Sequence, residues 1–366
     1  MSSGATAVRG AVSLALIATL AACSGTTGAS ATGATPPASA TPTTGASPSN
    51  GASGEAPSGS LVVYNAQHES LTQAWVDAFT AATGVKVELR NGDDSELANL
   101  LVEEGSASPA DVFLTENSPS MALVEKAGLF GPVDQATLDQ VPAPYRPSTG
   151  LWTGIAARST VFAYDKRVLT DADLPKSLLD LQTDAWKGRW AASPGGADFQ
   201  AIVAALLDLK GADATSAWLE GMKANFKPYQ GNTTVMKAVN AGEIPGGVIY
   251  HYYWFGDQAK TGENSVNVGL HYFRNADPGA FVSVSGGGVL KTSKNPVAAQ
   301  ALLKFITGVD GQKILQTGDS FEYAIASDVP ANPELVPLVD LQAPAIDPSK
   351  LDSETTIELM TEAGIL

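Results

Sequence analysis

Side chains that can bind a metal ion follow closely on several apolar runs of this sequence. His68 follows the first such run, Glu116 follows the third, and Tyr252 and Tyr253 follow the glycine-led run 246–251. If these runs are strands of open α/β sheets, their carboxyl ends border a crevice, which is where such sheets bind ligands. The imidazole, the carboxylate and the two phenols are therefore predicted to lie at crevice edges.

Each of these residues also has an ordinary structural explanation. His68 alone could be a capping or surface histidine, and Glu116 alone could be a solvated loop carboxylate. Adjacent tyrosines usually pack their rings and use their hydroxyls in hydrogen bonds. The combination is more informative, because oxygen donors with one imidazole suit Fe(III), a hard and highly charged ion. Zinc would call for more histidine or thiolate, and calcium for more clustered carboxylates.

A possible anion site lies in the segment 193–198, SPGGAD, just before an apolar helical stretch. A helix N-terminus preceded by glycine exposes main-chain N–H groups and can bind an anion. Gly195 and Gly196 could equally mark a simple turn. The sequence alone leaves both interpretations open.

The elements that would position these residues alternate along the chain. From residue 61 onwards, strand-like runs and amphipathic helical stretches follow one another with short links, which predicts a parallel sheet with right-handed crossovers. Ser70 and Gln73 have the spacing of a capping box that opens the first helix. The alternation resumes after residue 155, so two α/β lobes are expected. The expected strands are 61–64, 85–89, 110–114, 155–164, 188–192, 246–251 and one within 279–291; the expected helices are 70–83, 95–104, one from 118, 199–209, 213–225, 298–307 and 353–363.

Length and charge narrow the class of protein. A chain of 366 residues with 44% hydrophobic and 16% charged residues is large enough for two domains with substantial cores. Its net charge of −16 repels phosphates, so no nucleic-acid partner is expected. A soluble, monomeric solute binder fits this composition.

The N-terminus has the pattern of a secretory signal. One positive charge precedes the apolar run 11–20, which is too short to span a membrane stably. The following LAAC resembles the lipobox of bacterial lipoproteins, and Cys23 in it is the only cysteine of the chain. We expect a signal peptide at 1–22, a lipidated Cys23 anchored to the outer face of the cell membrane, and a disordered tether at 23–60 rich in Gly, Ala, Ser, Thr and Pro. The alternative is an ordinary signal with an incidental cysteine.

Several motifs resemble the ferric-ion-binding proteins of bacterial iron ABC transporters. They are YNAQH at 64–68, EGSASPADVF at 104–113, YYW at 252–254, and DPGA at 277–280 before a glycine-rich strand. The resemblance extends from about residue 61 to the C-terminus. It implies a two-lobed periplasmic-binding-protein fold of type II, whose lobes are joined by crossover segments and close around the ion by a hinge. The implied lobes are 61–160 plus 284–335 and 161–283 plus 336–366.

The resemblance also implies a set of metal ligands. His68 and Glu116 from the first lobe would meet Tyr252 and Tyr253 from the second lobe around one Fe(III). Tyr250 stands where the family has an asparagine, and it could be an additional ligand.

Some members of the family add a synergistic anion, such as phosphate or carbonate. The residues that would bind it here are Asn117, Gly195, Gly196, Ala197 and Asn232. Asn117 replaces a glutamine of the family and Gly195 replaces a serine, so the presence and identity of the anion stay open.

The implied function is capture of Fe(III) outside the cytoplasm and delivery to an ABC-transporter permease, without catalysis. The alternatives within the class of solute-binding proteins are that the solute is an iron chelate, an oxyanion or a polyamine. An extracellular hydrolase using His68 and Glu116 as base and acid is a further alternative, although the sequence contains no nucleophile-elbow motif to support it.

Overall fold

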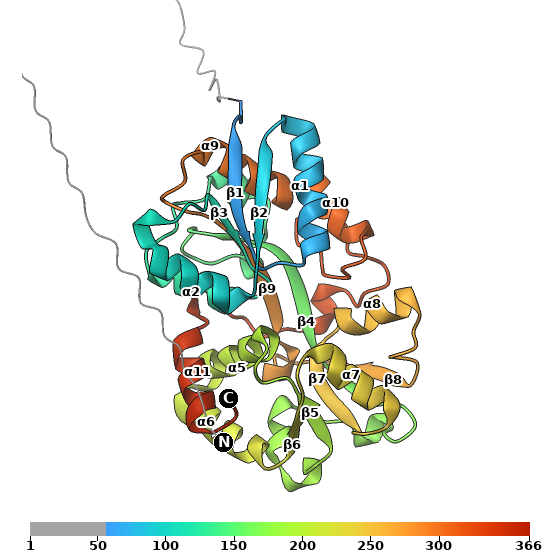
Figure 1. Ribbon diagram of the computed structural model, residues 1–366. Coiled ribbons are helices and arrows are strands. Elements are labelled where there is room, and N and C mark those ends of the chain that lie inside the picture. The colour runs from blue at the N-terminus through green and yellow to red at the C-terminus, as the bar shows by residue number, and fades with distance from the viewer. Residues whose placement is uncertain (1–55) are drawn as a thin grey trace, which may run out of the picture. The chain divides into compact units, whose positions relative to one another are not determined.

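The computed structural model describes residues 56–366 (Figure 1). The expected signal peptide, Cys23 and all of the linker up to residue 55 lie outside these described residues. Between residues 56 and 366, no helix has the length and apolar character needed to cross a membrane.

The first lobe is built on three parallel strands. β1 (Ser60–Asn65) pairs with β2 (Lys86–Asn91) on one side and with β3 (Val112–Leu114) on the other. α1 (Glu69–Thr83) connects β1 to β2, and α2 (Asp94–Glu104) connects β2 to β3. The expected strand–helix alternation with parallel pairing is therefore confirmed in this lobe.

The first helix begins earlier than the sequence predicted. Ser70 and Gln73 indicated a capping box, but α1 begins at Glu69 and its N-cap residue is His68. Gln73 donates instead to Asp77, one turn further along the helix. Glu69 in the first turn already suits the positive end of the helix dipole. The imidazole of His68 makes no capping hydrogen bond, so its ring nitrogens are left for other partners.

Two long antiparallel strands connect the lobes. β4 (Thr153–Asp165) pairs with β9 (Val282–Val289) over its first half and with β7 (Gly246–Tyr250) and β8 (Val268–His271) over its second half. β9 also pairs with β3. Figure 1 shows β4 and β9 running between the two groups of elements. The lobe boundaries expected at 160 and 283 fall inside these strands and stay a prediction.

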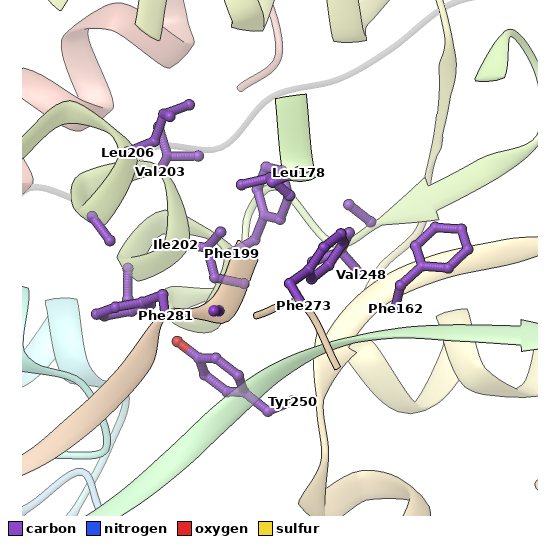
Figure 2. Packing of buried hydrophobic residues seen from close by; sticks show 14 of the residues in the cluster. Phe162, Leu178, Phe199, Ile202, Val203, Leu206, Val248, Tyr250, Phe273 and Phe281 are labelled. Carbon is purple, nitrogen blue, oxygen red and sulfur yellow. The ribbon is translucent and has the colours of Figure 1, made fainter. Parts of the chain in front are cut away.

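The second lobe has a mixed sheet covered by helices. β5 (Trp190–Ala192) lies parallel to both β6 (Phe226–Pro228) and β7. α5 (Ala197–Lys210) follows β5, and α6 (Ala212–Lys223) leads into β6. In the core of this lobe, Phe199 and Ile202 of α5 belong to the same apolar cluster as Val248 and Tyr250 of β7 (Figure 2).

Several elements of the structure were not predicted from the sequence. They are α4 (Gln135–Leu138), β6, α7 (Asn232–Ala241), α8 (Tyr252–Lys260), β8 and α10 (Val309–Thr317). In the segment 246–260 the aromatic residues favour a strand, but β7 stops at Tyr250 and α8 begins at Tyr252. Tyr252 and Tyr253 therefore form the first turn of a helix and not a strand-end loop.

The remaining helices complete the two lobes. α11 (Ser353–Glu362), close to the C-terminus, contacts α5, α6 and the helix Ser118–Lys126, which is α3. The others are α3 (Ser118–Lys126), α4 (Gln135–Leu138) and α9 (Pro296–Thr307). Short 3-10 turns occupy Gly105–Ala107, Ala143–Tyr145, Asp171–Asp173, Leu178–Gln182, Asp184–Trp186, Pro278–Ala280, Leu338–Leu341 and Pro348–Lys350.

Candidate functional site

The first-lobe half of the site is the pair of His68 and Glu116. His68 precedes α1 and Glu116 lies between β3 and α3, so both follow strands that are parallel neighbours in one sheet. The structure brings Nε2 of His68 to 3.0 Å from Oε1 of Glu116. Their side chains are 28% and 22% exposed, so the pair is shielded but not sealed from solvent.

Two fully buried charged residues, Glu322 and Arg158, contact this pair on the side that faces the core. Glu322 places Oε2 3.3 Å from Nδ1 of His68, and its other oxygen accepts a hydrogen bond from Nη2 of Arg158. Arg158 also donates to the main-chain carbonyl of Glu116 and, at 2.6 Å, to the hydroxyl of Ser285. The sequence analysis did not select either buried residue.

The second-lobe half of the site is centred on Asp198. This aspartate lies in the first turn of α5, and its side chain turns towards the start of α8. The hydroxyl of Tyr253 donates to Oδ2 of Asp198 at 2.9 Å, and the hydroxyl of Tyr252 donates to the same oxygen at 3.2 Å. Asp198 was missed, although the segment SPGGAD that contains it had been singled out.

The two halves meet in the structure. The ring of His68 lies edge-on to the ring of Tyr252, with 5.1 Å between their centroids. Nδ2 of Asn117, at the start of α3 in the first lobe, donates to Oδ1 of Asp198 at 3.0 Å. The guanidinium carbon of Arg158 lies 5.7 Å from the ring centroid of Tyr252. The predicted metal ligands from both lobes are therefore brought together.

Two cavities border this cluster. One, of about 550 Å³, is lined by His68, Tyr252 and Tyr253 together with residues of α7 and α8. The other, of about 1000 Å³, is lined by Glu116, Asp198 and Tyr253. Its lining also contains four of the residues expected to bind an anion, namely Gly195, Gly196, Ala197 and Asn232.

The two amides expected to bind the anion already have a protein partner. Nδ2 of Asn232 donates to Oδ2 of Asp198 at 2.8 Å, and Nδ2 of Asn117 donates to its Oδ1. Asn117 is buried and does not line the larger cavity. A carboxylate of the chain thus occupies the position between these amides.

Tyr250 lies apart from the two cavities. Its side chain is fully buried, and its hydroxyl lies 3.3 Å from the main-chain oxygen of Asp198 and 3.4 Å from Oδ1 of Asn117. It is not among the lining residues of either cavity. Its contacts are those of a residue that holds Asp198 and Asn117 in place.

The electrostatics of the site follow from burial and from its three acidic side chains, Glu116, Asp198 and Glu322. Burial raises the pKa of Glu116 to about 7. Burial opposes the positive charge on His68, but the neighbouring Glu322 outweighs this effect and raises the pKa of His68 to about 9. Burial also opposes the charge on Glu322, but Arg158 and His68 lower its pKa to about 2.

The phenols are held in their neutral form. Burial, reinforced by the charge of Asp198, raises the pKa of Tyr252 and of Tyr253 well above the usual value. Both hydroxyls therefore keep their protons at neutral pH and donate hydrogen bonds to Asp198.

The donor set of the site is dominated by oxygen. In residues 56–366, no three His, Cys, Asp or Glu side chains are arranged as a metal site. Phenol and carboxylate oxygens suit a hard ion such as Fe(III) better than zinc.

Comparisons with known proteins agree with this chemistry. The family model described as bacterial extracellular solute-binding protein matches residues 107–348. The chain is 65% identical to the Fe(3+)-binding periplasmic protein of Serratia marcescens, over 84% of this chain and 90% of that protein. It is 37% identical to the major ferric iron-binding protein of Neisseria meningitidis serogroup B, over 83% and 93% of the two chains. Iron-bound HitA from Pseudomonas aeruginosa has a similar structure, with a TM-score of 0.78, 40% identity, and coverage of 83% of this chain and 99% of that one.

Proposed function

The chain belongs to the family of bacterial extracellular solute-binding proteins, and we propose that its solute is Fe(III), captured between the lobes for delivery to the permease of an ABC importer. The observation that carries the proposal is the convergence of the Tyr252 and Tyr253 hydroxyls on Asp198 beside the pair of His68 and Glu116. The relatives and the similar structure named above, whose names refer to ferric iron or to bound iron, support it.

The proposed ligands are His68, Glu116, Tyr252 and Tyr253, with Asp198 as a fifth protein ligand. Nε2 of His68 and the carboxylate of Glu116 come from the first lobe, and the other three side chains come from the second. Both phenol hydroxyls donate hydrogen bonds to Asp198. An incoming Fe(III) replaces these protons, so both phenolates and the carboxylate then face the ion.

We propose that Asp198 takes the role expected for a synergistic anion. Asn117 and Asn232, the two amides that would hold the anion, both donate to this carboxylate. Gly195, which replaces a serine of the family, leaves open space, because a Cβ added there meets no atom within 4 Å. A charged group of the chain is therefore already placed where phosphate or carbonate was expected. Tyr250, which contacts the main chain of Asp198, supports this carboxylate and is not itself a ligand.

The charges of the site favour a metal ion over a polyamine. A polyamine would need acidic side chains without nearby cations, but Arg158 bonds Glu322 and His68 contacts Glu116. We propose that the protein captures and releases its ion without catalysis. Its expected anchor at Cys23 would hold it at the outer face of the cell membrane, near the permease.

Titration of the full-length protein with ferric citrate tests this function. Phenolate-to-iron charge transfer gives a visible absorption band, and we expect it to saturate at one Fe(III) per chain. The Tyr252→Phe, Tyr253→Phe double variant should lose the band, because neither remaining ring can form a phenolate. Tyr164→Phe is the matched control, since Tyr164 lies on β4 outside both cavities. A colourless unaltered protein, or equal colour in the double variant, would refute ferric-tyrosinate binding.

A further inference from the structure

Glu322 reaches the site on a turn with an unusual backbone conformation. Phe321, just before it, has a φ of 55°, a left-handed conformation that non-glycine residues rarely adopt. The turn is held on both sides of Glu322. The ring of Phe321 stacks on Phe255 of α8 at 5.8 Å, and Tyr323 exchanges main-chain hydrogen bonds of 2.8 and 3.1 Å with Ala157 of β4. Such strain persists where the surrounding structure over-determines it, and it is frequent at functional sites.

The turn delivers a fully buried carboxylate to the far side of His68. Oε2 of Glu322 lies 3.3 Å from Nδ1 of His68, whereas Nε2 of the same ring faces Glu116 at 3.0 Å. Oε1 of Glu322 accepts from Nη2 of Arg158 and, at 3.4 Å, from Nε2 of Gln67. A carboxylate anchored in this way can hold the imidazole in one orientation.

Arg158 joins the supports of both first-lobe ligands. The same guanidinium that binds Glu322 donates to the main-chain carbonyl of Glu116. Arg158 lies on β4, the strand that connects the lobes, and its side chain is fully buried. The positions of His68 and of Glu116 are thus linked through one buried ion pair.

We propose that Glu322, clamped by Arg158, is a positioning residue that holds the proton of His68 on Nδ1 and leaves Nε2 for the metal ion. This inference rests on the proposed function, because it concerns a ligand of that site. Histidines that bind metals usually donate their other ring N–H to such a partner, which fixes both tautomer and orientation. The imidazole would then be oriented before the ion arrives, and the ion would displace the proton on Nε2 of His68 as well as the protons of the phenols.

The variant Glu322→Gln tests the proposal, because it keeps the size of the side chain and removes its charge. Loss of a hydrogen-bond partner of a metal-binding histidine typically lowers the metal affinity by about 10- to 100-fold. We expect this loss in competition titrations of Fe(III) against citrate. The visible band should persist at saturation, since both phenols remain. Glu125→Gln is the matched control, because Glu125 also accepts a hydrogen bond from a buried side chain, Trp152, but outside the site.

A double variant separates positioning from a general structural effect. In a His68→Ala background, Glu322→Gln should lower the Fe(III) affinity by a clearly smaller factor than in the unaltered protein, because the imidazole that Glu322 positions is gone and only the support of Glu116 through Arg158 is still affected. An equal loss in both backgrounds, or an unchanged affinity in Glu322→Gln alone, would overturn the proposal.

Nitrogen-15 NMR of the histidine rings gives a readout that needs no variant. In the unaltered protein loaded with diamagnetic Ga(III), we expect His68 to carry its proton on Nδ1 and to bind through Nε2. Binding through Nδ1 would overturn the inference even if Glu322→Gln failed to fold. If the unaltered protein bound neither Fe(III) nor Ga(III), the proposed function would fail instead. The inference, which rests on that function, would fail with it.

Discussion

At the scale of single residues, Asp198 is the central side chain of the proposed metal site. Its two oxygens accept hydrogen bonds from both phenols and from both amides that an added anion would otherwise use. Asp198 is only 5% exposed. Burying a carboxylate without hydrogen-bond partners would destabilise the fold, so these four donors are needed. In the proposed site, this carboxylate stands in for an added anion.

Asp198→Asn should lower the affinity for Fe(III) by at least about 10-fold. The amide keeps the shape of the side chain but carries no charge and cannot replace a carboxylate ligand. Competition titration against citrate measures the change, and Asp208→Asn on the exposed face of the same helix serves as control. Unchanged affinity in Asp198→Asn, or a requirement of the unaltered protein for phosphate or carbonate, would contradict the role given to Asp198.

At the scale of elements, β4 is a strand that connects the two lobes, and it also contains the buried Arg158. Its pairing with β9 shifts register between Gly154 and Ala156, which marks a bulge in the first half of the strand. A Cβ on Gly154 would lie 2.0 Å from the carbonyl oxygen of Tyr145 and 2.8 Å from Val284. The close approach of these chains at the crossover therefore requires glycine at this position.

Gly154→Ala should lower the free energy of unfolding by about 1–3 kcal/mol, because the backbone of Tyr145 must move. Gly195→Ala is the control, since a Cβ there meets nothing within 4 Å, and we expect a change within about 0.5 kcal/mol. Urea denaturation of both variants measures the difference. Equal stabilities would show that the crossover tolerates a side chain.

At the scale of the whole molecule, ion capture is linked to proton release. The pKa values of Tyr252 and Tyr253 lie well above the usual value, because the rings are buried beside Asp198. The phenols are therefore protonated without the ion, and in the proposed site they lose their protons when the ion binds. Because binding releases protons, the affinity for Fe(III) rises with pH and falls on acidification.

Each phenol proton released should change the Fe(III) affinity by about tenfold per pH unit. Calorimetry in buffers of different ionisation enthalpy counts the released protons directly. Tyr252→Phe should release about one proton fewer than the unaltered protein, whereas Tyr164→Phe should release the same number. An affinity independent of pH between about 5.5 and 7.5 would exclude the phenols as ligands.

The sequence by itself determined the alternation of strands and helices in the first lobe and the approximate position of the site. Apolar runs identify buried strands locally, and ligands gather at strand ends in such sheets. This is why His68, Glu116, Tyr252 and Tyr253 could be selected without a structure. The helical conformation of Tyr252 and Tyr253 could not, because their aromatic residue types favour a strand, whereas the ladder of β7 with β4 stops at Tyr250 and His251 is already in the helical conformation.

Only the tertiary structure decided which other charged groups complete the site. Asp198 resembles any acidic residue in the first turn of a helix, and its phenol partners are 54 and 55 positions away. Glu322 lies 254 positions from His68, and no local pattern relates them. Burial together with long-range pairing selects such residues, since a buried charge is stable only where the fold supplies its partners.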